Sequence, residues 1–110
     1  MQQRRPRARR YPFVASIELT DIKSEEKLSG QTTEISLFGC RVEKAKLWPP
    51  ETRVRIQIVH LGESFLALGR VVYARVGMGI AFTNIEANKG LVLEKWIAGA
   101  AKKKVERVGD

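Results

Sequence analysis

The sequence predicts a mainly β protein, in which about six short antiparallel strands close into a barrel or a sandwich and one helix follows at the C-terminal end. Apolar and polar residues alternate with a period of two through most of the chain, and turn signals rich in glycine and proline separate these stretches. Towards the end the apolar spacing becomes helical. A length of 110 residues, 44% of them hydrophobic, suits one domain with a single core.

The alternation defines the strands one by one. It begins at Val14, where Ala15, Ile17 and Leu19 share one face of a strand. Further strands are expected over residues 28–34, 39–44, 53–60, 64–75 and 78–83. Short connections between successive strands favour an antiparallel meander.

A helix is expected after the last strand. Leu91, Leu93, Trp96, Ile97 and Ala100 fall close to helical spacing, and Trp96 is expected to anchor the helix to the barrel. Asn84 is a candidate N-cap for this helix. We therefore divide the chain into a flexible basic arm (1–11), the domain with its helix (12–101) and a charged tail (102–110).

Composition limits the class of function. The formal charge of +8 predicts an anionic partner, which nucleotide, nucleic acid or an acidic membrane surface would satisfy. The single cysteine, Cys40, excludes an internal disulfide and, with one histidine, leaves no cluster for a zinc site. No run of about 18 apolar residues and no secretory signal occurs, so a cytoplasmic protein is expected.

Five arginines lie within residues 4–10, and Arg5 and Arg9 stand four positions apart. Each guanidinium can donate two hydrogen bonds to a phosphate or to O6 and N7 of guanine, and its planar face can stack on a base. A basic arm by itself also fits any polyanion.

A second segment, Glu34-Ile35-Ser36-Leu37-Phe38-Gly39, joins two of the predicted strands. Ser36 can donate or accept a hydrogen bond, and Gly39 permits a close approach to the backbone. Alone, this segment is also typical of a plain turn between strands. Leu37 and Phe38 are expected to belong to the core.

Together the two segments resemble the PilZ family, whose pattern is R-x-x-x-R followed by D/N-x-S-x-x-G. Arg5 and Arg9 match the first motif, and Ser36 and Gly39 match the second. The similarity extends through residues 50–54 and 79–82, so it covers nearly the whole chain. The resemblance implies a six-stranded β-barrel that binds the bacterial second messenger cyclic di-GMP, with the arginines on guanine and phosphate.

The chain departs from this pattern at two points. Glu34 stands where the family has Asp or Asn, and its extra methylene displaces the carboxylate. Arg10 competes with Arg9 as the second arginine, although the residue four positions before it is Pro6. The candidate cyclic di-GMP-binding residues are therefore Arg5, Arg9, Arg10, Glu34, Ser36 and Gly39.

The expected function is that of a sensor module, not an enzyme, whose arm becomes ordered over cyclic di-GMP and relays the signal to a protein partner. No nucleophile with a base, metal cluster or phosphate-binding glycine loop is apparent. One alternative is an adaptor that kept the barrel and lost the nucleotide, and Glu34 favours it. Another is a small nucleic-acid-binding barrel, which the basic arm favours. The sequence leaves open whether the protein is a monomer or a homodimer.

Overall fold

The computed structural model describes residues 9–43 and 46–108, with side chains as far as Lys102. Within these residues the chain forms strands β1 (Tyr11–Pro12), β2 (Ser16–Asp21), β3 (Lys27–Ile35), β4 (Gly39–Glu43), β5 (Arg53–His60), β6 (Glu63–Ala74) and β7 (Gly77–Ile85), then helix α1 (Lys89–Val108).

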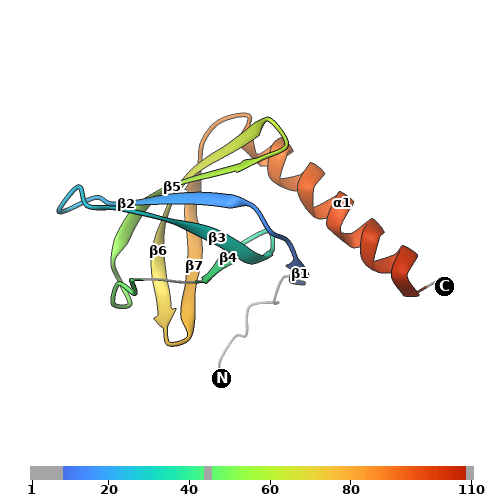
Figure 1. Cartoon of the computed structure of the whole chain (residues 1–110). Helices are drawn as coiled ribbons and strands as arrows, with labels where there is room; N and C mark the ends of the chain where they lie inside the picture. The colour runs from blue at the N-terminus through green and yellow to red at the C-terminus, as the bar shows by residue number, and fades with distance from the viewer. Residues whose placement is uncertain (1–8, 44–45, 109–110) are drawn as a thin grey trace, which may run out of the picture.

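The strands close into a barrel. Their order in the sheet is β1-β3-β2-β5-β6-β7-β4, and every pairing is antiparallel. In addition, β4 at the end of this order pairs with β3, so the sheet closes on itself. Strands β2 to β7 therefore form a closed six-stranded barrel, and β1 is a short addition beside the end of β3 (Figure 1). The mainly β prediction is confirmed, and closure favours the barrel over the sandwich. The expected meander was wrong, because β4 and β5 follow each other in the chain but do not pair.

The inside of the barrel is the core, and the alternation read from the sequence fills it. On β5, which has the predicted bounds, Val54, Ile56 and Ile58 are buried, whereas the residues between them are exposed. Phe65 and Leu19 are the largest fully buried side chains. Removing these apolar side chains from water supplies the main free energy for closing the barrel.

Helix α1 covers one end of this core. It contacts β6 and β1 and runs away from the barrel towards its C-terminus (Figure 1). Trp96 is buried, and its ring centroid lies 5.4 Å from that of Phe13, 5.8 Å from that of His60 and 6.3 Å from that of Phe65. Trp96 thus anchors the helix as predicted, and Leu93 is buried beside it in the same core cluster.

The predicted helix start was wrong. Asn84 lies within β7, where it pairs with Leu68 of β6, so its side chain does not cap the helix. The helix begins at Lys89 after Asn88, which has a left-handed φ of 72°. The strand β7 continues to Ile85, and this pairing outweighs the local capping preference of asparagine. At the other end the helix includes residues 102–108, which were expected to form a tail.

In the part of the chain that the structure describes, no helix combines the length and the apolar character needed to cross a bilayer.

Replacing Trp96 with alanine is expected to lower the free energy of unfolding by about 3–5 kcal/mol, since it leaves a cavity between the helix and the barrel. Leu91→Ala is the matched control because Leu91, on the same helix, is 69% exposed; it is expected to change stability by under about 0.5 kcal/mol. Urea denaturation followed by circular dichroism measures both. Equal effects of the two changes would contradict the anchoring role of Trp96.

Candidate functional site

Strand β1 holds the end of the basic arm against the second motif. Tyr11 pairs with Ile35 and Pro12 with Glu34, and the amide of Phe13 donates to the carbonyl of Thr33 at 3.0 Å. Residue 11 is therefore part of the sheet, although it was expected to belong to the arm. The pairing places Arg10, which precedes Tyr11, beside the end of β3.

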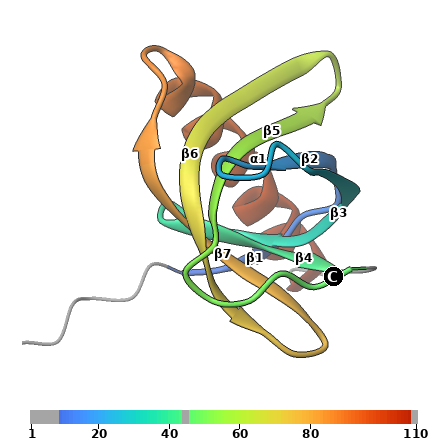
Figure 2. The same ribbon diagram turned by 90° about the vertical axis from the view of Figure 1, so that its left-hand side faces the viewer.

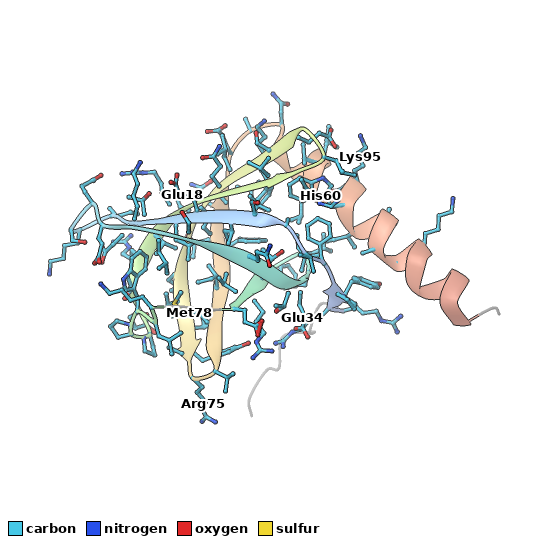
Figure 3. All side chains as sticks on the ribbon, in the orientation of Figure 1. Glu18, Glu34, His60, Arg75, Met78 and Lys95 are labelled. Carbon is cyan, nitrogen blue, oxygen red and sulfur yellow. The ribbon has the colours of Figure 1, made fainter. Side chains whose placement is uncertain are left out.

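Arg10 is the arm residue that the structure ties to the motif. Its Nη1 lies 3.8 Å from Oε1 of Glu34, and both side chains remain partly exposed. Figure 3 shows Glu34 beside strand β1. Arg9 is also exposed. Arg5, the remaining arginine of the predicted site, lies outside the described residues.

The segment from Ser36 to Gly39 is a tight turn that Ser36 stabilises. The Ser36 amide donates to the Gly39 carbonyl at 2.9 Å. The Ser36 hydroxyl accepts from the amides of Phe38 and Gly39, each at 3.2 Å, and donates to the Gly39 carbonyl at 3.3 Å. A hydroxyl has one donor and two acceptor positions, so these bonds use all of them. Ser36 therefore positions the turn.

Gly39 lets this turn lie against β7. A Cβ atom at this position would be 2.1 Å from the carbonyl oxygen of Ile80, far inside van der Waals contact. Gly39 pairs with Ala81 in the β4–β7 ladder, and the Phe82 amide donates to the Phe38 carbonyl at 2.8 Å. The glycine of the motif is thus required by the closure of the barrel.

The prediction that Leu37 and Phe38 belong to the core was wrong. They occupy the two corner positions of the turn, and they are 47% and 61% exposed. The alternation that would point one of them inward ends at Ile35, because the chain turns there.

A β-bulge places Glu34 on the outside of the barrel. Strict alternation from Thr32, which is fully buried, would point Glu34 inward. The register shifts between Thr32 and Glu34, so Thr33 is the extra residue and Glu34 pairs with Arg41 of β4. Directly opposed residues point to the same side of a sheet, so the Glu34 carboxylate and the Arg41 side chain share the outer face.

A second bulge brings Tyr73 to the same row. Val71 is buried and pairs with Ile80, the register then shifts, and Tyr73 pairs with Gly79. Gly79 also pairs with Arg41. The Tyr73 ring covers Gly79, where a Cβ atom would come within 2.1 Å of Cε2. Glu34, Arg41 and Tyr73 therefore form one outward row, which spans about 14 Å at the usual strand spacing.

Sequence reasoning missed Arg41 and Tyr73 as site residues. Only the β3–β4 register shows that Arg41 lies beside Glu34. Tyr73 could not be found from alternation, because Phe65, Ala67 and Val71 predict that it points inward. The bulge reverses that prediction.

The groove of about 610 Å³ on the outer face of β2, β5 and β6 is separate from this row. Glu18, Arg55, Gln57 and Leu66 are among the residues that line it, and none of the predicted site residues does. Cys40 points into the core, where burial raises the pKa of its thiol to about 12, so it stays protonated and unreactive near neutral pH. Residues 9–43 and 46–108 contain no group of His, Cys, Asp or Glu side chains that could hold a metal ion.

Together with Arg10, the outer row presents two guanidinium groups. The carboxylate of Glu34 lies between Arg10 and Arg41, and the ring of Tyr73 lies at the far end. Such a surface offers charged hydrogen bonds to phosphates and flat faces for bases. It lies on a rigid barrel, next to a turn with little conformational freedom. These features suit the binding of a small anionic ligand.

The comparisons identify the family. The family model of the PilZ domain, which describes the sequences of its members, matches residues 3–99. The chain therefore belongs to the PilZ family. Members of this family are binding and adaptor modules and not enzymes. A search among curated proteins found no match.

Two solved structures share this fold. The PilZ domain of CeSA from a cellulose-synthesizing bacterium is 22% identical, with a TM-score of 0.65 over 84% of this chain and 97% of its own. The inhibitor of motility MotI/DgrA of Bacillus subtilis is 16% identical, with a TM-score of 0.70 over 96% of this chain and 53% of its own. At these identities the likeness concerns the fold.

Replacing Gly39 with alanine is expected to destabilise the barrel by at least about 2 kcal/mol, because backbone atoms of β7 must move to admit a methyl group. Gly99→Ala is the control, since a methyl group on this helical residue would point into open space and alanine favours a helix by up to about 1 kcal/mol. Thermal unfolding compares them. If both variants unfold at or above the wild-type temperature, the close approach does not constrain residue 39.

Proposed function

We propose that this protein binds cyclic di-GMP on the outer row beside the Ser36–Gly39 turn and relays the signal to a protein partner in the cytoplasm. The observation that carries the proposal is the β1–β3 pairing, which brings Arg10 to the motif that ends β3. The end of the basic arm at Arg10 and the second motif, which are far apart in the sequence, thus lie side by side. Membership of the PilZ family supports the same ligand.

The arginines supply the main recognition. Cyclic di-GMP carries two phosphodiesters and two guanines, so it has two negative charges and two sets of O6 and N7 acceptors. Guanidinium groups match both kinds of acceptor with paired hydrogen bonds. Arg5, Arg9 and Arg10 are assigned this role, with Arg10 already held beside the turn through Glu34.

The turn supplies shape. Because the hydroxyl of Ser36 is fully used within the turn, Ser36 acts by holding the backbone in place. Gly39 keeps the turn close to β7, because any larger residue would meet the Ile80 carbonyl oxygen.

Arg41 and Tyr73 extend the surface away from the arm. Tyr73 is half-buried over Gly79, so its ring is fixed in orientation, and Arg41 lies between it and Glu34 in the row. A fixed aromatic face and a guanidinium plane each stack on a base without a large loss of entropy. We assign the second guanine to this end of the row.

Glu34 competes with the ligand for Arg10. The ion pair is 3.8 Å long and solvent-exposed on both sides; such pairs contribute under about 1 kcal/mol. A phosphate that carries a full negative charge can replace the carboxylate. Glu34 thus keeps Arg10 in place when the ligand is absent and lowers the net affinity by a small amount.

A second candidate function is an adaptor that acts through protein contacts and holds no nucleotide. Glu34 in place of Asp or Asn, paired with an arginine that would otherwise contact the ligand, favours it. A nucleic-acid-binding barrel is less well supported, because Phe13, Phe65 and Trp96 are buried in the core, and a single ring, Tyr73, in the outer row is no platform for successive bases.

Titration calorimetry tests the proposal. Cyclic di-GMP is expected to bind with a Kd on the order of micromolar or tighter, whereas GTP and cyclic AMP produce no comparable heat. Arg10→Ala is expected to weaken binding by about tenfold or more, as loss of a charged hydrogen bond does. Arg53→Ala is the matched control, since it removes an exposed arginine on β5, away from the row. Equal losses of affinity for the two variants would show that the effect comes from net charge and not from the position of Arg10.

Glu34→Asp separates the two candidate functions. A shorter carboxylate restores the family pattern and lengthens the contact to Arg10. If the protein is a nucleotide sensor, the unmodified chain binds and the substitution raises affinity by a factor of about two to ten. If it is an adaptor, the unmodified chain gives no heat. No binding by either form would end the nucleotide proposal.

A further inference from the structure

The tip of the β3–β4 turn exposes two large apolar side chains next to each other. Leu37 is 47% and Phe38 61% exposed, and among the described residues they are the only exposed large hydrophobics that are neighbours in the sequence. Single exposed apolar residues are normal on a protein surface. An exposed leucine and phenylalanine next to each other on a turn form an apolar patch that can serve as an interaction site.

Hydrogen bonds of this turn lower the free-energy cost of moving its backbone out of water. The amides of Ser36, Phe38 and Gly39 all donate within the turn, and the Phe38 carbonyl accepts from the Phe82 amide. Unpaired amides and carbonyls are the main penalty for placing a turn in an apolar medium. Here four of those groups are already paired, and the contact of Gly39 with β7 keeps the turn rigid.

Cations flank the tip. The β1–β3 ladder ends at Tyr11, so Arg10 and Arg9 precede it beside the start of the turn. Figure 2 shows strand β1 beside the β3–β4 hairpin, with which it pairs through β3. The Glu34 carboxylate lies 3.8 Å from Arg10 and offsets one of these charges, whereas the chain before Glu18 contains five arginines and no acidic residue.

An anionic bilayer fits both parts of this surface. Its apolar interior takes the side chains of Leu37 and Phe38, and its headgroup phosphates match the arginines. Each part alone is weak, because stable membrane attachment needs an apolar and an electrostatic contribution together. The exposed side chains of Leu37 and Phe38 are free to contact such a surface.

We propose that the Leu37–Phe38 tip inserts into anionic membrane surfaces while Arg9 and Arg10 bind the lipid phosphates. Because Arg10 is also assigned to the nucleotide, cyclic di-GMP and the membrane compete for it, and the messenger releases the protein from the bilayer. The membrane contact stands independently of the proposed function, and only the competition depends on it.

Sedimentation with lipid vesicles tests the contact, using the full chain without nucleotide. Vesicles of phosphatidylcholine with about one third phosphatidylglycerol are expected to bind the protein, with affinity falling as salt rises. Pure phosphatidylcholine is expected to bind at least about tenfold more weakly. The double change Leu37→Ser with Phe38→Ser is expected to lower affinity for the anionic vesicles by about tenfold or more. Leu61→Ser is the matched control, because Leu61 is 88% exposed on the turn between β5 and β6, and it is expected to bind as the unmodified chain does.

A fluorescent variant tests insertion. Trp48 and Trp96 are both buried, so Phe38→Trp adds an exposed indole at the tip. Its emission is expected to shift to the blue on anionic vesicles and to be quenched by brominated lipid chains. Binding without the shift would show attraction by charge alone and would overturn the insertion.

The remaining outcomes separate the two proposals. Absence of binding to anionic vesicles at low salt overturns the membrane inference. So does a double variant, Leu37→Ser with Phe38→Ser, that binds these vesicles as tightly as the unmodified chain but no longer binds cyclic di-GMP. Binding to vesicles with no heat from cyclic di-GMP supports the membrane inference and removes the nucleotide proposal. If both bind but the nucleotide does not release the protein, the competition is wrong.

Discussion

The close approach of Gly39 to the Ile80 carbonyl is the contact on which the site depends. It allows β4 to pair with β7 while β4 also pairs with β3, and these pairings close the barrel. A closed barrel leaves no free edge between these strands, so the turn that joins β3 to β4 has one position. The position of this turn also decides which residues lie beside Arg10, Arg41 and Tyr73 on the outer face.

The architecture was predictable because burial in this barrel follows the simplest rule of β structure. Residues such as Ile56 and Ile58 alternate with exposed neighbours, and glycine and proline occur where the chain turns. The helix was predictable for the same reason, since Leu93 and Trp96 share the face that meets the core. Its start was not, because the choice between an N-cap and a longer β7 at Asn84 depends on pairing with Leu68 of β6.

The site was only partly predictable. The motif places Ser36 and Gly39 correctly in a turn, and the structure adds that their direct task is to shape it. Arg10 could not be distinguished from Arg9 in the sequence, because the distinction depends on where β1 pairs with β3. Tyr73 and the exposed tip at Phe38 were missed, since alternation is a local rule that ends at a bulge or a turn.

The bulges at Thr33 and at Val72 let the barrel take up an extra residue without changing the surface beside it. In each case the residues on either side of the extra one keep consecutive partners on the neighbouring strand, which are Val42 and Arg41 for the first bulge and Ile80 and Gly79 for the second. Deleting Thr33 or Val72 would therefore restore plain alternation and leave Glu34 and Tyr73 on the outer surface, with less local bend and twist in the strand. A relative that lacks one of these residues can thus keep both motifs, the barrel and the same outward row.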